Sequence, residues 1–175
     1  VSAGNVGRAQ HAYSAKLFGY LPARRGLRIL DIGGGAGETA KNLIALGHFV
    51  EIVVPSAFLA GRCRANAPDA VVHECTFQDL QSDGGFDLCL FSESFQYIPP
   101  EIALTKAHSL LNPLGEILIG DCFRTDAFLT KPSVVGIGIV RGRIPTLAMG
   151  SYRLMFTEDH FVCLGHPCST TVMSA

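Results

Sequence analysis

An acid and four glycines gather in the stretch LDIGGGAGETA, residues 30–40. The acid is Asp31, and the glycines are Gly33, Gly34, Gly35 and Gly37. Glycine lets a ligand approach the backbone closely, and a helix that begins after such a turn offers free N–H groups. An apolar run precedes the glycines and a helical pattern follows them. The stretch therefore predicts a strand, a nucleotide-binding turn and the start of a helix.

The residues that follow the glycines decide which nucleotide suits the turn. A dinucleotide fingerprint needs a glycine at the sixth position from Gly33, where this chain has Glu38. A phosphate-binding loop needs Lys after its last glycine, but Gly37 is followed by Glu38 and Thr39. Because a carboxylate in the first helical turn repels a pyrophosphate, we expect a ligand without phosphates at this end. A tight turn without any ligand is the alternative, although its glycines would cost chain entropy for no packing gain visible in the sequence.

Three segments of the chain closely resemble class I S-adenosylmethionine-dependent methyltransferases. RILDIGGGAGETAKNLIALGHFV resembles the family's first motif, acid-x-Gly-x-Gly-x-Gly. GGFDLCLFSESFQYIP resembles its fourth strand and following loop, and LLNPLGEILIGD resembles the turn and the fifth strand. The resemblance covers Arg28 to about Asp121, and it implies a Rossmann-like fold, S-adenosylmethionine as the cofactor and methyl transfer as the activity.

The resemblance also implies which residues would bind the cofactor. Asp31 matches the acid that meets the cofactor's ammonium directly or through water, and Gly33 and Gly35 match the glycines beneath its methionine part and ribose. The implied cofactor-binding residues are Asp31, Gly33, Gly34, Gly35, Val54, Pro55, Thr76, Phe77 and Phe91.

Two of these positions depart from the family pattern. Val54 stands where the family places the acid that holds the ribose hydroxyls, and Thr76 stands where it often places the acid that accepts from adenine. Losing one charge-assisted hydrogen bond costs roughly 1.5–3 kcal/mol. Cofactor binding is therefore expected to be weak, or to be rebuilt by Ser56, Gln78 or Asp79. For Phe77, a role against adenine and a role in the core stay equally open.

The loop after the fourth expected strand, SESFQYIPP, holds the catalytic candidates. Ligands of such sheets bind at the carboxyl ends of the strands. Glu93 could take a proton from the acceptor or anchor an acceptor amine, and Tyr97 could hydrogen-bond the acceptor. The alternatives are a solvated loop residue for Glu93 and a wall residue for Tyr97. Near the N-terminus, Tyr13 is either a lid residue or, more simply, a packing residue.

Apolar strands alternate with helices over the first two thirds of the chain. The expected strands are LRILDI, HFVEIVV, AVVHECTF, FDLCLFS and EILIGDCF, and a helix is expected over residues 8–20. Strands that are apolar on both faces indicate a parallel sheet with helices on both sides. We therefore expect an α/β fold with a doubly wound, mostly parallel Rossmann-like sheet, and the resemblance to the methyltransferases implies the strand order 3-2-1-4-5. Residues 28–32 should form the central strand, and the resemblance also implies an antiparallel strand from beyond residue 140 after the fifth.

Composition limits the partners of the chain. The 175 residues are 48% hydrophobic and 17% charged, with a net charge of −1 and no basic stripe, so neither nucleic acid nor a membrane is expected as a partner. The six cysteines form no CxxC pair, and no metal is expected. Cysteines near the ends of apolar runs fit reduced thiols and a cytoplasmic location.

The sequence predicts a single domain that transfers methyl groups from S-adenosylmethionine to a small molecule. Within it, residues 1–25 are expected to form a helical lid, 26–123 the cofactor-binding core and 124–175 a substrate-side segment. A homodimer is left open. One alternative is a domain of this fold that binds cofactor or product without transferring methyl, such as a biosynthetic cyclase or a regulatory subunit. The lesser alternative is an NAD(P)-dependent oxidoreductase.

Overall fold

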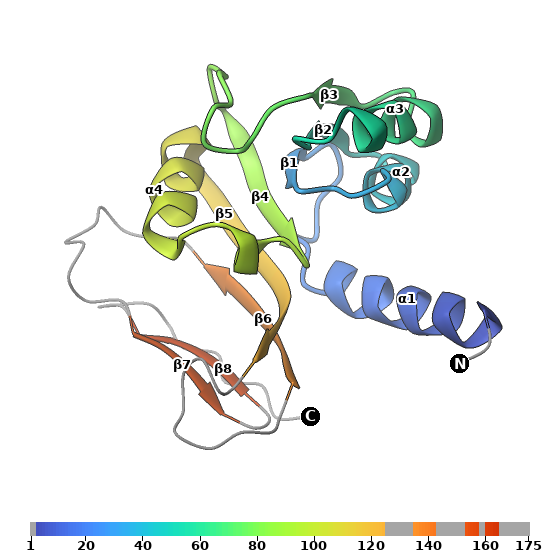
Figure 1. Cartoon of the computed structure of the whole chain (residues 1–175). Coiled ribbons are helices and arrows are strands. Elements are labelled where there is room, and N and C mark those ends of the chain that lie inside the picture. The colour runs from blue at the N-terminus through green and yellow to red at the C-terminus, as the bar shows by residue number, and fades with distance from the viewer. Residues whose placement is uncertain (1–2, 125–134, 143–152, 158–159, 165–175) are drawn as a thin grey trace.

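A six-stranded sheet organises the computed structural model, which describes residues 3–124, 135–142, 153–157 and 160–164 (Figure 1). The strand order is β3-β2-β1-β4-β5-β6. Strands β1 to β5 run parallel, and β6 pairs with β5 in the antiparallel direction. The strands are β1 (Arg28–Ile32), β2 (Phe49–Val53), β3 (Val71–His73), β4 (Phe86–Ser92), β5 (Leu111–Arg124) and β6 (Val135–Gly142).

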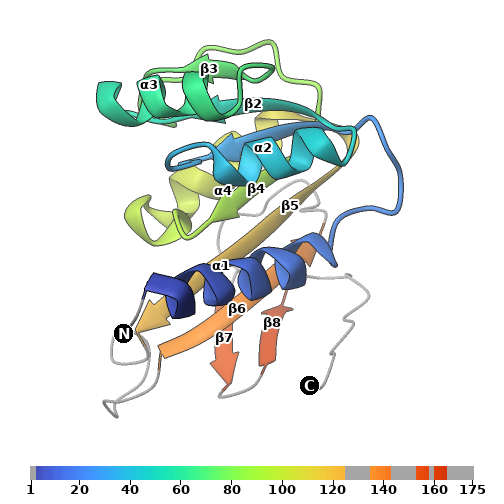
Figure 2. The same cartoon turned by 90° about the vertical axis from the view of Figure 1, so that its right-hand side faces the viewer.

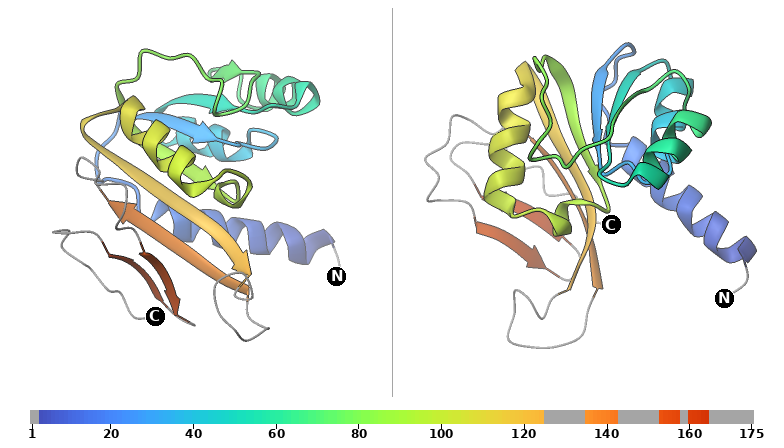
Figure 3. Two further views of the ribbon diagram at one scale, coloured as in Figure 1. Left: turned by 60° about the vertical axis from the view of Figure 1, so that its left-hand side comes forward. Right: turned by 45° about the horizontal axis from the view of Figure 1, so that its top comes forward.

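Helices cover both faces of this sheet. The helices are α1 (Ala3–Phe18), α2 (Glu38–Ala45), α3 (Ala57–Asn66), α4 (Pro100–Leu110) and the short 3-10 helix η1 (Phe95–Tyr97). Figure 3 shows α4 on one side of the sheet and α1, α2 and α3 on the other. Alternate residues of β1 follow this division, since Ile29 packs in the core under α2 and α3 while Leu30 and Ile32 pack in the core under α4.

Local sequence explains where the helices begin and end. The α2 helix starts after Gly37 in the left-handed conformation. The Ser56 hydroxyl accepts from the Leu59 N–H and caps α3, as a serine at this position predicts. Pro100 stands at the start of α4, where a missing N–H is tolerated, and the chain becomes extended at Leu111 ahead of Pro113.

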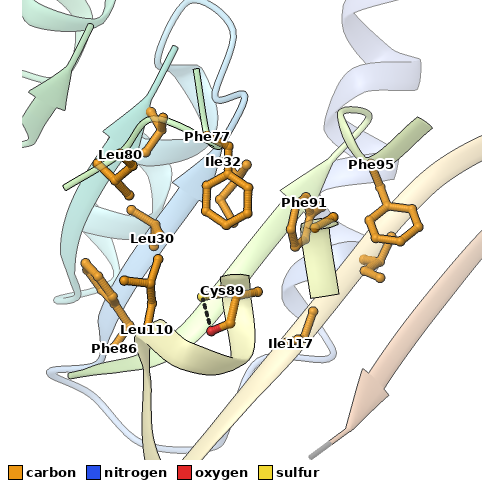
Figure 4. Close-up of a cluster of buried hydrophobic side chains, with 14 residues drawn as sticks. Leu30, Ile32, Phe77, Leu80, Phe86, Cys89, Phe91, Phe95, Leu110 and Ile117 are labelled. Atoms are coloured by element: carbon orange, nitrogen blue, oxygen red, sulfur yellow. Dashed lines mark hydrogen bonds between the residues drawn. The ribbon is translucent and has the colours of Figure 1, made fainter. Parts of the chain in front are cut away.

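The core on the α4 side is rich in aromatic rings. Phe91 of β4 meets Phe77 and Phe95 edge to face, with ring centroids 5.7 and 5.3 Å apart. Figure 4 shows these three rings together with the Cys89 thiol, which donates to the Ala107 carbonyl of α4. Burying one such side chain contributes roughly 1.5–3 kcal/mol, so this cluster fixes the carboxyl end of β4.

The α/β fold class, the strand order 3-2-1-4-5 and the central position of β1 are confirmed. The antiparallel neighbour of β5 is also present, but it occupies Val135–Gly142 and therefore starts earlier than predicted. The third strand ends at His73 instead of running to residue 77. It ends early because Thr76 and Asp79 bond to each other in a turn that withdraws this segment from the sheet edge.

A long helix precedes the six-stranded sheet in the chain, and a separate strand pair follows it. Helix α1 begins at Ala3, earlier than the predicted residue 8, and Figure 2 shows it lying across β5 and β6. Two further strands, β7 (Arg153–Thr157) and β8 (His160–Leu164), form a separate antiparallel pair. Much of the predicted substrate-side segment, at 125–134, 143–152, 158–159 and 165–175, lies outside the described residues. No helix in the described ranges is both long and apolar enough to cross a lipid bilayer.

Candidate active site

The glycine stretch forms a tightly wound loop at the carboxyl end of β1. Gly33, Gly35 and Gly37 all have positive φ, at 75°, 54° and 87°. The Gly35 N–H donates to the Gly33 carbonyl at 2.7 Å, and the Gly37 N–H donates to the Gly34 carbonyl at 2.9 Å. The Gly33 N–H donates to the Val53 carbonyl at 2.8 Å and ties the loop to β2. Side chains other than glycine rarely adopt these φ values, which explains why glycine recurs here.

Three of the four glycines make room for other parts of the protein. A Cβ at Gly33 would lie 2.5 Å from the Ser94 Cβ, one at Gly34 2.5 Å from the Asp31 Oδ2, and one at Gly37 3.0 Å from the Cys63 Cα. The expectation that these glycines bring no packing gain is therefore wrong. It failed because the contacts of Gly33 and Gly37 are made by residues distant in the sequence, and because the orientation of the Asp31 side chain toward Gly34 depends on the fold of the loop.

Gly35 differs from the other glycines. Apart from Gly35 itself and its two chain neighbours, no described residue has a heavy atom within 4 Å of a Cβ built on it. Packing within the described protein therefore does not explain the space above Gly35. A bound molecule that approaches the backbone would use that space. Of the four glycines, Gly35 therefore gives the best support for the prediction that this loop binds a ligand.

Asp31 lies on β1 directly under this loop. Its side chain is fully buried, and no donor in the described residues reaches either carboxylate oxygen. Burial without such donors raises the pKa of Asp31 to about 7. Two unsatisfied buried acceptors are costly, and a cationic N–H donor would satisfy both the charge and the hydrogen bonds. An ammonium group, such as that of S-adenosylmethionine, fits this requirement.

The ends of β2 and β3 match the expected ribose and adenine positions less well. Val54 is 1% exposed and packs in the core under α2 and α3, while the following Pro55 is exposed. The exposed Thr76 donates its hydroxyl to the Asp79 carboxylate at 2.7 Å and accepts from the Asp79 N–H at 3.2 Å. The Thr76 hydroxyl thus uses its one donor and one of its acceptor positions within the protein. The same bonds place the Asp79 carboxylate beside the position where the family's acid is missing.

Two aromatic residues proposed from the resemblance lie in the hydrophobic core. Phe77 is 3% exposed and Phe91 is fully buried, and both belong to the cluster under α4. Lys106 of α4 holds the segment around Phe77 by donating to the carbonyls of Gln78 and Leu80. Of the two roles left open for Phe77, the structure therefore supports the core role.

The predicted acceptor loop follows β4 and stands beside the glycine loop. Ser94 donates to the Ile32 carbonyl and packs against Gly33, so the two loops touch. Glu93 is exposed and has a φ of 58°, which is unusual for a residue with a side chain. Tyr97 is 79% exposed. Both catalytic candidates thus reach solvent at the carboxyl end of the sheet.

Four residues that shape this region were missed from the sequence. Cys63 and Asn66 of α3 donate to carbonyls of the glycine loop, at Gly35 and Ala36. Ser94 connects the two loops as described above. The buried Asp121 of β5 accepts from the Gln96 N–H and from its side-chain amide, both at 3.1 Å. A charged residue inside the apolar predicted fifth strand was a signal for Asp121, but nothing local pointed to Cys63 or Asn66.

Two hollows of the described surface lie away from this region. One is lined by Arg24, Asp87 and Asn112, and the other lies around His48, so both are near the amino ends of the strands. The Asp87 carboxylate there accepts from the Arg28 N–H, Arg24 and Asn112, and these bonds hold its pKa below the usual value despite partial burial. These contacts join the amino ends of neighbouring strands. Parallel sheets of this kind bind their ligands at the carboxyl ends of the strands, so neither hollow is a candidate for the cofactor site.

Comparison with known proteins assigns the family. The methyltransferase domain family matches residues 7–160. The chain therefore belongs to this family.

Its relatives share modest sequence identity. A 27-O-demethylrifamycin SV methyltransferase from Amycolatopsis mediterranei is 27% identical over 156 residues, which cover 83% of this chain and 54% of that protein. A ubiquinone biosynthesis O-methyltransferase from Xanthomonas axonopodis pv. citri is 27% identical over 145 residues, which cover 77% of this chain and 60% of that protein. The chain thus spans only about half to three fifths of the length of these relatives.

Solved structures support the same class. A TehB-like SAM-dependent methyltransferase from Corynebacterium glutamicum has a TM-score of 0.57 and 26% identity, covering 69% of this chain and 70% of that chain. The N-methyltransferase NodS from Bradyrhizobium japonicum, solved with S-adenosyl-L-homocysteine, has a TM-score of 0.58 and 18% identity, covering 69% and 63%. The second likeness concerns the fold alone. The class is therefore that of S-adenosylmethionine-dependent, Rossmann-like methyltransferases.

Proposed function

We propose that this chain transfers a methyl group from S-adenosylmethionine to a small-molecule acceptor. The observation that carries the proposal is the buried carboxylate of Asp31 packed against Gly34, one residue from the open side of Gly35. An ammonium group would offset the cost of that buried acceptor. The loop with Glu93 and Tyr97 adjoins this position through Ser94, so cofactor and acceptor would meet at one place.

Each residue has a defined task in this proposal. S-adenosylmethionine supplies, when bound, a methyl group activated by its sulfonium. Asp31 holds the ammonium end, and Gly35 leaves room for the chain of the ligand. Glu93 would accept the proton that the acceptor's O–H or N–H loses on methylation, and Tyr97 would orient the acceptor by a hydrogen bond; S-adenosylhomocysteine would be the leaving group as the carbon–sulfur bond breaks.

The acceptor class follows from charge and from the relatives. The chain has a net charge of −1 and no basic stripe for a nucleic-acid backbone. Two relatives, a 27-O-demethylrifamycin SV methyltransferase and a ubiquinone biosynthesis O-methyltransferase, are named for small-molecule chemistry. We also infer a reducing, cytoplasmic compartment, because Cys63, Cys75 and Cys89 are free thiols.

Calorimetric titration with S-adenosylmethionine, S-adenosylhomocysteine and NAD⁺ tests the proposal. We expect the first two to bind and NAD⁺ not to bind. The Gly35→Val variant should lose binding, because its branched side chain fills the open space and is strained at a φ of 54°. Gly61→Val in α3 is the matched control, since a Cβ there also meets no neighbour within 4 Å among the described atoms, yet Gly61 lies outside the loop. A Gly35→Val protein that binds like the parent would reduce the loop to a structural turn.

A second function is favoured by Val54. A buried apolar residue at the expected ribose-holding position suits a domain that binds the cofactor or its product weakly and transfers no methyl group. Incubation with methyl-labelled S-adenosylmethionine and a panel of phenols, catechols and amines separates the two functions. Label transfer to any acceptor supports the methyltransferase, whereas binding of S-adenosylhomocysteine with no transfer across the panel supports the non-catalytic domain. Binding of NAD⁺ alone would revive the oxidoreductase.

A further inference from the structure

We propose that α3 sets the shape of the cofactor loop through Cys63 and Asn66, which act as positioning residues. The proposal rests on the proposed function, because it assigns these side chains a role in cofactor affinity. It goes beyond the glycine motif itself, since neither residue belongs to that motif.

The two side chains bind consecutive carbonyl groups of the loop. The Cys63 Sγ donates to the Gly35 carbonyl at 3.2 Å, and the Asn66 Nδ2 donates to the Ala36 carbonyl at 2.9 Å. Residues three apart on a helix share one face, so α3 presents both donors to the loop together. Gly37 permits this approach, because a Cβ there would lie 3.0 Å from the Cys63 Cα.

These bonds determine where the loop directs its own N–H groups. A trans peptide unit is planar, and its C=O and N–H point in opposite directions. The bond from Cys63 holds the Gly35 carbonyl toward α3, so the Ala36 N–H points away from α3. The bond from Asn66 likewise orients the Gly37 N–H, which donates to the Gly34 carbonyl and closes the loop. The loop therefore offers the Ala36 N–H on the side away from α3, as a donor for the carboxylate of a bound amino-acid group.

The environment of Cys63 preserves its role as a donor. The residue is fully buried, and burial together with the negative charge of Asp31 raises the pKa of its thiol. The S–H therefore stays protonated at neutral pH, which donation to a carbonyl requires. An apolar side chain of similar size would fill the same space but leave the Gly35 carbonyl without this donor.

Substitutions at Cys63 separate donation from packing. Cys63→Ser replaces the sulfur with a smaller oxygen that can still donate, whereas Cys63→Ala removes the thiol group and the donor with it. We expect Cys63→Ala to weaken S-adenosylhomocysteine binding by about fivefold to tenfold, and Cys63→Ser to stay within about twofold of the parent. Affinity is measured by calorimetry well below the midpoint of thermal unfolding, which is determined for each variant.

Substitution at Asn66 gives an independent arm. Asn66→Asp keeps the shape but turns a carboxylate oxygen toward the Ala36 carbonyl, so affinity should fall by at least about tenfold. Asn42→Asp on the neighbouring helix α2 is the matched control, because it makes the same substitution at an exposed helical position. We expect no change in affinity for that control.

The outcomes distinguish this proposal from the proposed function. If the parent binds S-adenosylhomocysteine and both Cys63→Ala and Asn66→Asp bind equally well, the positioning role is overturned. If Cys63→Ser weakens binding as much as Cys63→Ala, packing and not donation is the cause, which also overturns it. If the parent binds neither form of the cofactor, the proposed function fails and the cofactor role fails with it. Hydrogen exchange at Gly37, whose N–H donates to the Gly34 carbonyl, then still tests the anchoring, because exchange should be faster in Cys63→Ala than in Cys63→Ser.

Discussion

Burial changes the acid–base behaviour of Asp31. Its pKa is raised from 3.8 to about 7 by desolvation, so the folded protein binds a proton more tightly than the unfolded chain does. Between about pH 4 and pH 7 the folded state therefore holds more protons, and its stability falls as pH rises through this range. Above pH 7 this contribution to stability is lost, and a bound cation would restore it.

The Asp31→Asn variant tests this behaviour. In this variant the free energy of unfolding should fall less steeply with pH between about pH 4 and pH 7. Above pH 7 it should exceed that of the parent by at most about 4 kcal/mol. The same change removes the negative charge that an ammonium needs, so S-adenosylmethionine should bind at least about tenfold more weakly. Denaturant unfolding across pH and calorimetric titration measure the two effects. A variant that is less stable at pH 8 and binds the cofactor normally would show that Asp31 has a partner in solution.

Glu93 combines an exposed carboxylate with a strained backbone. Its φ of 58° costs roughly 1–2 kcal/mol for a residue with a Cβ, and the bond from its N–H to the Gly120 carbonyl holds it there. Strain at an exposed position beside a predicted site suggests that the side chain is retained for function and not for stability.

Two substitutions of Glu93 separate strain from chemistry. Glu93→Gly should raise the free energy of unfolding by about 0.5–1 kcal/mol, because relief of strain exceeds the added chain entropy. Glu93→Gln should leave stability unchanged but lower kcat by roughly 100-fold if the carboxylate accepts the proton. Thermal unfolding and label transfer to an identified acceptor provide the measurements. Full activity in Glu93→Gln would remove Glu93 from the catalytic role.

The elements β4, β5 and η1 meet in a network that positions the acceptor loop. The buried carboxylate of Asp121 receives two donors from Gln96, and the Gly120 carbonyl receives the Glu93 N–H. The end of β5 thereby holds both ends of the loop that carries Glu93 and Tyr97. Since Phe95 is buried between these contacts, the loop has both a polar and an apolar anchor.

We expect Asp121→Asn to loosen this loop. The amide cannot accept from both Gln96 donors, so one buried bond is lost, at a cost of about 1–3 kcal/mol. A double-mutant cycle with Gln96→Met isolates the side-chain bond from the backbone bond. A coupling energy near zero would show that the side-chain amide of Gln96 does not contribute. In the exposed Ser109→Ala control of α4, stability should change by less than about 0.5 kcal/mol.

At the scale of the whole molecule, α1 connects the start of the described chain to the middle of the sheet. The Tyr13 hydroxyl donates to the Gly120 carbonyl at 2.9 Å and lies 3.3 Å from the Ser92 Oγ. Gly120 allows this approach, because a Cβ there would lie 2.7 Å from the Tyr13 hydroxyl. Leu17 is buried in the same core as Leu118, so the helix is held by both polar and apolar contacts.

The Tyr13→Phe variant should destabilise the protein by about 1 kcal/mol, because the ring stays packed while the hydroxyl bonds are lost. Tyr20→Phe is the control, since Tyr20 is a half-buried tyrosine near α1 whose ring packs on the same core. Its free energy of unfolding should change by less than about 0.5 kcal/mol. Equal losses in the two variants would place the effect in general packing and not in the contact with β5.

The sequence by itself determined the alternation of strands and helices and the position of the glycine turn. These features depend on residues close together in the chain, such as the apolar run before Gly33 and the Ser56 cap. Apolar strands with helices between them also indicated a parallel sheet, whereas the strand order came from the family resemblance. The predicted placement of the third strand's end failed, since the Thr76–Asp79 turn competes with the sheet and alternation alone does not reveal it.

Only the tertiary structure decided what surrounds the glycine turn. The two carboxylate oxygens of Asp31 have no hydrogen-bond donor among the described residues. A sequence pattern cannot predict this, because it depends on which side chains the fold brings near Asp31. The contacts of Cys63 and Asn66 join positions about 30 residues apart. The contact of Gly33 with Ser94 and the bonds that Gln96 donates to Asp121 likewise depend on parallel strands ending at the same edge. Such pairings form only when the strands assemble into the sheet. Local sequence determines whether a segment becomes a helix or a strand, but it does not determine which side chains from distant segments come into contact.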